Sequence, residues 1–152
     1  MYQLNQTQSE LQARAGALAD GPIRERAAEV DRTEAYPWDN VDRLREAGLV
    51  GMTIPQAYGG QGLGWLETAI VVEQLARTCA VTARIAVETN MGGVSAIMAY
   101  GSEDQKRMAA EMVLSGDKPA ICITEPEAGS AATEMSTTAR RVDGGWVLNG
   151  MK

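Results

Sequence analysis

The sequence predicts an α+β protein in which an all-α domain, residues 1–116, precedes the beginning of a β domain, residues 117–152. Apolar residues before Gly116 recur at helical spacing, whereas those after it alternate or form short runs typical of strands. The chain has 152 residues, which is enough for one domain or for one domain and part of another. Hydrophobic residues make up 45% and charged residues 22%, a balance typical of globular proteins.

The first predicted helix carries its apolar residues on one face, formed by Leu4, Leu11, Ala15 and Leu18. Gly21-Pro22 should end or kink it, because proline removes a backbone donor. A second helix is expected over residues 23–33, and Tyr-Pro-Trp at residues 36–38 should end it. Asp39 is a good N-cap for a short third helix, with Gly48 in the position that follows its last turn.

A glycine-rich loop is expected over residues 52–64. It matches neither the dinucleotide-binding nor the P-loop pattern, so we interpret it as a connection between helices. Further helices are expected over residues 65–78, 81–100 and 102–115, the last one opened by a capping box of Ser102 and Gln105. Four methionines in this region are expected to fill the core: Met91, Met98, Met108 and Met112.

The predicted β part begins with a short apolar strand over residues 119–124. A hairpin follows, in which residues 137–142 pair with residues 146–148 around the turn at Asp143-Gly144-Gly145. Asn149-Gly150 is a second turn signal, and only two residues come after it. A turn without a following strand would leave a sheet edge unpaired, so the β domain is expected to be truncated.

The composition excludes several kinds of chemistry. The chain contains no histidine, so it has no Ser-His-Asp or Cys-His nucleophile pair and no histidine-ligated metal, and we expect no metal site. The net charge of −6 argues against nucleic acid as a partner. Cys79 and Cys122 lack metal-ligand spacing and are expected to be buried free thiols in a reducing compartment.

The chain also lacks the usual signals for membranes and secretion. Residues 1–6 carry neither a basic stretch nor an apolar core of the kind found in secretory signals. The longest apolar run is too short to cross a bilayer. We therefore expect a cytoplasmic protein with no membrane partner.

One candidate site is the segment over residues 121–130. Its predicted strand ends at Thr124, Pro126 forces a turn, and Gly129 and Ser130 offer backbone N–H groups beside a hydroxyl. Such a turn could bind an anionic or polar heteroaromatic ligand. It could equally be an ordinary connection between the helical and β parts.

Arg84 is the second candidate, because it lies among apolar residues of a predicted helix. It either pairs with Glu88 one turn further on, or binds an anionic group with its planar guanidinium. From the residues alone, the ion pair is the favoured interpretation.

The segment Ile-Thr-Glu-Pro-Glu-Ala-Gly-Ser at residues 123–130 lies between a helical stretch and Gly-Trp-Val-Leu-Asn-Gly-Met-Lys at residues 145–152. This pattern resembles the acyl-CoA dehydrogenase family, and so does the loop Ile-Pro-Gln-Ala-Tyr-Gly-Gly-Gln-Gly-Leu-Gly at residues 54–64. The resemblance implies a helical N-terminal domain, a β-barrel-like middle domain and a C-terminal helical bundle. It also implies FAD as cofactor, an acyl-CoA thioester as substrate, and a homodimer or homotetramer of the full-length protein.

The chain is more similar to a subgroup of this family that removes sulfite from 3-sulfinopropanoyl-CoA. The segments that carry this resemblance are Glu-Ala-Tyr-Pro-Trp-Asp-Asn-Val at residues 34–41, Gly-Asp-Lys-Pro-Ala-Ile-Cys-Ile at 116–123 and Ala-Gly-Ser-Ala-Ala at 128–132. Other family members usually have an aspartate after Gly-Ser and often an aromatic residue three positions before the threonine. Ala131 and Ile121 occupy those positions here, which fits the desulfinase subgroup.

The resemblance also implies roles for single residues. The flavin would be lined by Ile121, Cys122, Ile123 and Thr124. Gly129 and Ser130 would lie at the FAD pyrophosphate and the pantetheine arm of the substrate. Arg84 would bind the sulfinate, which makes the anion-binding interpretation the favoured one.

Three functions agree with these features of the sequence. The first is the N-terminal part of a desulfinase that converts 3-sulfinopropanoyl-CoA and water to propanoyl-CoA and sulfite. The second is part of a conventional FAD-dependent acyl-CoA dehydrogenase. The third is an inactive fragment or a helical interaction module, and we expect the 152 residues alone to be inactive.

Overall fold

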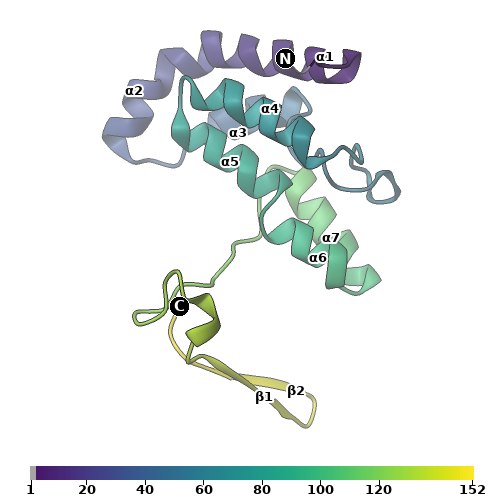
Figure 1. Cartoon of the computed structure of the whole chain (residues 1–152), viewed down its shortest axis with the longest axis vertical. Helices are drawn as coiled ribbons and strands as arrows, with labels where there is room; N and C mark the ends of the chain where they lie inside the picture. Colours follow the sequence, from purple (N-terminus) through teal and green to yellow (C-terminus); the bar gives the residue numbers. More distant parts are fainter. Residues whose placement is uncertain (1–2) are drawn as a thin grey trace. The chain divides into compact units, whose positions relative to one another are not determined.

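In the computed structural model the chain forms two compact units, Met1–Ala120 and Ile121–Lys152, and residues 3–152 are described. The first unit is helical and the second contains a two-stranded antiparallel sheet, so the predicted fold class is confirmed (Figure 1). The predicted domain boundary after residue 116 stays a prediction. The expectation about a secretory signal rests in part on residues 1–2, which lie outside the described residues.

The first unit is built around α4 and α5, which pack against each other (Figure 1). Its helices are α1 (Gln6–Leu18), α2 (Arg24–Thr33), α3 (Trp38–Glu46), α4 (Trp65–Ala76), α5 (Ala80–Asn90), α6 (Gly93–Tyr100) and α7 (Glu103–Leu114), with a 3₁₀ turn at Gln56–Tyr58. α1 lies along α4, α3 contacts α5, and α6 packs against α7. Within residues 3–152 no helix combines the length and apolar character that a membrane crossing requires.

Buried apolar side chains from these helices and from the loop after α3 form one core. The largest among them are Leu11, Ile23, Leu44, Leu49, Met52, Ile54 and Leu75. Burying each such side chain contributes about 1.5–3 kcal/mol, so the core holds the helices in place. Of the four methionines expected in the core, Met98 alone packs against it: Met108 and Met112 are exposed on α7, and Met91 is half-buried outside the core cluster.

The kink predicted at Gly21-Pro22 is confirmed. α1 and α2 are joined by a π-helical turn at Ala19–Ile23, in which Gly21 leaves the helical region with φ −102° and ψ −111°. Pro22 cannot donate a backbone hydrogen bond, so the regular ladder is interrupted at this point.

The start of α3 differs from the prediction. The helix begins at Trp38 after Pro37, and Asp39 does not cap it. The Asp39 carboxylate instead accepts hydrogen bonds from Arg26 of α2 and from Arg43 one turn further along α3. Two guanidinium groups therefore compete successfully with the backbone amides for this carboxylate. Gly48 follows the helix with φ +67°, as predicted.

The helix predicted over residues 81–100 is in fact two helices, α5 and α6. The Asn90 side chain lies at the end of α5, where its Nδ2 donates to the carbonyls of Leu49 (2.9 Å) and Ala86 (2.8 Å) and its Oδ1 accepts from the Met52 amide (2.6 Å). At the break, a Cβ on Gly92 would lie 2.5 Å from Glu88 Oε2. The buried amide thus fixes the end of α5 to the loop after α3.

The glycine-rich loop over residues 52–64 is tightly packed. A Cβ on Gly60 would lie 2.1 Å from the carbonyl oxygen of Ile54, and Gly59 and Gly62 have positive φ. The Gln61 side chain donates to the Gly48 carbonyl at 2.7 Å. These contacts account for the glycines through backbone geometry, in agreement with their interpretation as a connection between helices.

The second unit contains the predicted hairpin, formed by β1 (Thr138–Val142) and β2 (Gly145–Asn149) around Gly144 with φ +80°. The strand predicted over residues 119–124 is wrong, because residues 121–124 find no neighbouring strand among the described residues. Cys122, in this segment, is exposed rather than buried, while Cys79 of the first unit is buried as expected.

Candidate functional site

Arg84 lies on α5 and lines a cavity of about 380 Å³ in the first unit. Tyr36, Ala80, Val81, Ile85, Glu88 and Lys118 also line it. The side chain of Arg84 is 71% exposed, and its Nη2 forms an ion pair with Glu88 Oε1 one turn further on. The ion pair predicted from the residues alone is therefore present, and Arg84 is also one of the residues that line the cavity.

Lys118 brings a second cation to this cavity. Its Nζ donates a hydrogen bond to the Tyr36 hydroxyl at 2.6 Å and lies 4.3 Å from the centre of the Tyr36 ring. The Tyr36 ring in turn makes an edge-to-face contact with the Trp38 ring, and the two ring centres are 4.6 Å apart. The Tyr-Pro-Trp segment before α3 thereby positions a lysine 82 residues away in sequence.

The helix that carries Arg84 is held by buried polar contacts on its other side. Asn40 Nδ2 of α3 donates to Thr82 Oγ1 at 2.9 Å, and the Thr82 hydroxyl donates to Cys79 Sγ at 3.2 Å. Asn40 and Thr82 are both fully buried. Because a buried polar group without a partner is destabilising, these bonds favour one placement of α5 against α3.

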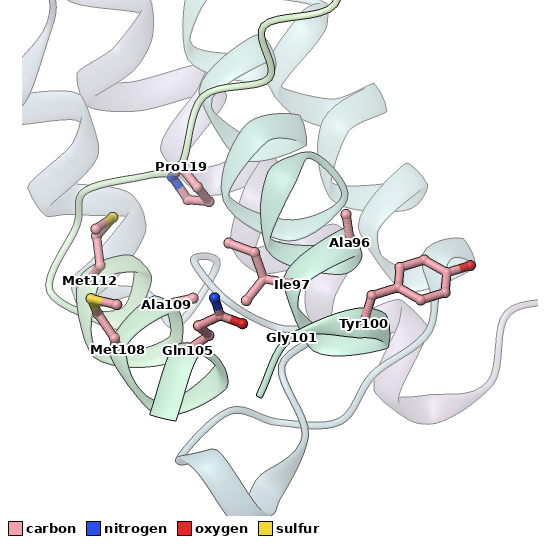
Figure 2. Close-up of a pocket in the computed structure, with 9 residues that line it drawn as sticks. All are labelled: Ala96, Ile97, Tyr100, Gly101, Gln105, Met108, Ala109, Met112 and Pro119. Atoms are coloured by element: carbon pink, nitrogen blue, oxygen red, sulfur yellow. The ribbon is translucent and has the colours of Figure 1, made fainter. Parts of the chain in front are cut away.

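A larger cavity of about 490 Å³ lies between α6 and α7. Figure 2 shows Ile97 and Gln105 pointing toward its middle, with Met108 and Met112 along one side and the Tyr100 ring directed away. None of its lining residues is charged. This cavity therefore suits an apolar group, whereas the cavity at Arg84 has two cationic residues and one carboxylate among the residues that line it.

The remaining predicted site residues belong to the second unit. Its turn is closed by two hydrogen bonds between the backbones of Glu125 and Ala128, at 3.0 and 3.2 Å. Among the described residues, no hydrogen bond is donated by the backbone N–H groups of Cys122, Thr124, Gly129 or Ser130. A Cβ built on Gly129 would meet nothing within 4 Å. The segment thus has four backbone donors without a partner among the described residues, and there is open space beside Gly129.

Glu125 holds this turn, and the sequence analysis did not single it out. Its buried carboxylate accepts hydrogen bonds from the Ser136 amide (2.6 Å), the Ser136 hydroxyl (2.9 Å) and the Thr137 amide (3.0 Å), and it pairs with Lys152 at 3.0 Å. The Thr137 side chain contributes most to lowering the pKa of Glu125 far below its ordinary value, although Thr137 Oγ1 makes no aligned hydrogen bond. The Ser136 amide, Lys152 and the Thr137 amide lower this pKa further against the effect of burial. No local pattern identifies it, because its partners Ser136 and Thr137 lie 11 and 12 residues further along the chain.

Arg84 belongs to the first unit, while Ile121, Cys122, Ile123, Thr124, Gly129 and Ser130 belong to the second. The structure therefore describes two separate parts of the predicted site. Their assigned roles toward flavin and substrate stay predictions. Lys118 and Tyr36 lie beside Arg84 although sequence reasoning did not select them as site residues.

Residues 5–117 match the family described as acyl-CoA dehydrogenase, N-terminal domain. The chain belongs to the acyl-CoA dehydrogenase family. Over all of its 152 residues it is 56% identical to the 3-sulfinopropanoyl-CoA desulfinase of Cupriavidus necator and 53% identical to that of Variovorax paradoxus, and it covers 38% of each of these proteins. Membership in the family predicted from residues 123–130 is thereby confirmed.

The fold agrees with solved structures of the acyl-CoA dehydrogenase family. A glutaryl-coenzyme A dehydrogenase in complex with glutaryl-CoA is 32% identical, with a TM-score of 0.90, and the alignment covers 99% of this chain and 39% of that one. The chain thus spans less than half the length of the relatives it matches, and it corresponds to their N-terminal portion.

Proposed function

We propose that the chain is the N-terminal portion of a flavoprotein that releases sulfite from 3-sulfinopropanoyl-CoA. The observation that carries the proposal is Arg84 at the rim of a cavity, in a chain more than half identical to two desulfinases over its whole length. In the overall reaction the bond between carbon 3 and sulfur breaks and the carbon takes a proton. The sulfur gains an oxygen from water and leaves as sulfite, so there is no net oxidation or reduction.

Arg84 would bind the sulfinate through two parallel, charge-assisted hydrogen bonds, which a guanidinium can donate to two oxygens at once. In the structure one of these donors is engaged by Glu88. The substrate must therefore share Arg84 with Glu88 or displace it.

FAD is the cofactor we propose for the second unit, and its residues fit such a group. Free backbone donors at Thr124, Gly129 and Ser130 suit the polar edge of a flavin and a pyrophosphate, and Gly129 leaves room for close approach. Ile121, Cys122 and Ile123 would line the ring, and Ser130 would also contact the pantetheine arm. When bound, the flavin would supply a planar polar surface that helps to polarise the thioester carbonyl. Glu125 keeps the turn in shape through its bonds to Ser136 and Thr137.

The test is sulfite release by the full-length protein that contains this chain. Purified protein incubated with 3-sulfinopropanoyl-CoA should form sulfite and propanoyl-CoA in equal amounts. Absence of both products from a flavin-loaded preparation would refute the proposal.

A conventional acyl-CoA dehydrogenase is the second candidate, favoured by the structural similarity to glutaryl-coenzyme A dehydrogenase. It would oxidise a saturated acyl-CoA and bleach the flavin absorbance under anaerobic conditions. Bleaching by butyryl-CoA or glutaryl-CoA without sulfite release from the sulfinate would favour this candidate. We further propose that the full-length protein is cytoplasmic and forms a homodimer or homotetramer. Light scattering of the purified protein measures the number of subunits, and fractionation of cells tests the location.

A further inference from the structure

One cationic residue that lines the cavity at Arg84 has no carboxylate partner among the described residues. Arg84 is paired with Glu88, whereas Lys118 makes no ion pair within residues 3–152, and its Nζ contacts only the Tyr36 hydroxyl and ring. The charged residues lining the cavity therefore leave one net positive charge, in a chain whose net charge is −6. A local charge opposite to that of the whole chain favours an anionic ligand at this place.

The surroundings of Lys118 increase the effect of its charge. Ala80, Val81 and Ile85 provide an apolar wall to the cavity, and Ile85 is buried. Charges interact more strongly beside such a wall than in bulk water. Tyr36 restricts the flexible lysine by a hydrogen bond and a cation–π contact, so less side-chain freedom is lost when a ligand binds.

We propose that Lys118 is a second anion-binding residue, which acts with Arg84 on the anionic end of the acyl group. The proposal rests on the proposed function and deepens it. Glu88 competes with the ligand for Arg84, and Lys118 supplies attraction that Glu88 does not offset. Propanoyl-CoA, the product, lacks the group that both cations bind. The same two residues therefore distinguish substrate from product and favour product release.

The experiment compares equilibrium binding of two thioesters to the flavin-loaded full-length protein by calorimetry. Succinyl-CoA carries a carboxylate in place of the sulfinate and contains no carbon–sulfur bond at that end, and propanoyl-CoA carries no anion. We expect Lys118→Met to weaken succinyl-CoA binding by about tenfold, the effect of losing one charge-assisted hydrogen bond, and to leave propanoyl-CoA binding unchanged. Lys118→Arg should retain most of the preference for succinyl-CoA over propanoyl-CoA. Tyr36→Phe should lose part of this preference.

Lys106→Met is the matched control, because Lys106 lies on α7 and pairs with Glu103 outside this cavity. The proposal is overturned if Lys118→Met binds succinyl-CoA as tightly as the wild type does. It is also overturned if both thioesters lose affinity equally, since that would indicate a contact with the CoA moiety or a change in fold. The binding preference is measured without turnover, so a protein that releases no sulfite would refute the proposed function while Lys118 is still tested.

Discussion

Asn40 of α3 and Thr82 of α5 share a buried hydrogen bond of 2.9 Å, and Thr82 lies two positions before Arg84. Through this bond the third helix supports the helix that carries the predicted anion-binding residue. Thr82 also donates to Cys79, so its hydroxyl is used as acceptor and donor. The placement of Arg84 therefore depends on a polar contact in the interior as well as on the apolar core.

We expect Thr82→Val to lower the free energy of unfolding by about 1–3 kcal/mol, because it leaves the buried amide of Asn40 without its acceptor. The double variant Asn40→Leu/Thr82→Val should lose less than the sum of the two single variants. Urea denaturation of the full-length protein measures all three. Thr78→Val is the control: Thr78 Oγ1 is buried without a partner, so its removal should be neutral or stabilising. Additive losses in the double variant would show that the two residues do not interact.

Arg84→Lys should lower the rate of sulfite release by two to three decades, which corresponds to roughly 2–4 kcal/mol of transition-state stabilisation. Lysine keeps the charge but cannot donate two parallel hydrogen bonds to one sulfinate. Steady-state kinetics with 3-sulfinopropanoyl-CoA measures the loss. Arg77→Lys is a suitable control, because Arg77 pairs with Asp20 away from the cavity. Unchanged sulfite release by Arg84→Lys would exclude the role assigned to this residue.

Glu125 should make the stability of the protein depend on pH. Its pKa is lower in the folded state than its ordinary value of 4.5, so the unfolded chain binds the proton more readily. The stabilising effect is therefore complete above about pH 4.5 and is lost as the pH falls below that value. The difference in urea midpoint between wild type and Glu125→Gln should narrow between pH 6 and pH 3. Glu127→Gln is the matched control, since this exposed side chain makes none of these bonds. A difference that stays constant over this range would contradict the prediction.

The 152-residue chain expressed alone should purify without bound flavin. It spans 38% of the desulfinases it matches, and residues 121–124 have no paired strand among the residues described. An absorbance spectrum between 300 and 550 nm, with free FAD as the standard, decides the question. A yellow fraction with one flavin per chain would show that these residues are sufficient for binding.

The sequence predicted those features that depend on neighbouring residues. Periodicity located the helices, and the capping box of Ser102 and Gln105 is present, with the two hydrogen bonds at 2.8 and 3.3 Å. The hairpin turn at Gly144 also follows from local composition. Family membership could be predicted as well, from the motif at residues 123–130, and the family match over residues 5–117 confirms it.

Features set by distant residues were missed. At the end of α5, before the break, Asn90 bonds to Leu49 of a distant loop, and Asp39 bonds to Arg26 of another helix. A strand at residues 121–124 would require a partner, which no local pattern can supply. For the same reason Lys118 was not recognised as a site residue, because Tyr36 is far from it in sequence.

The tight packing at Gly60 also limits how this protein can vary. A Cβ there would lie 2.1 Å from the Ile54 carbonyl oxygen, and a backbone atom cannot rotate away as a side chain can. Every codon change that replaces glycine introduces at least that one carbon. We therefore expect every substitution of Gly60 to disturb the loop, so that sequence variation in the loop is confined to other positions.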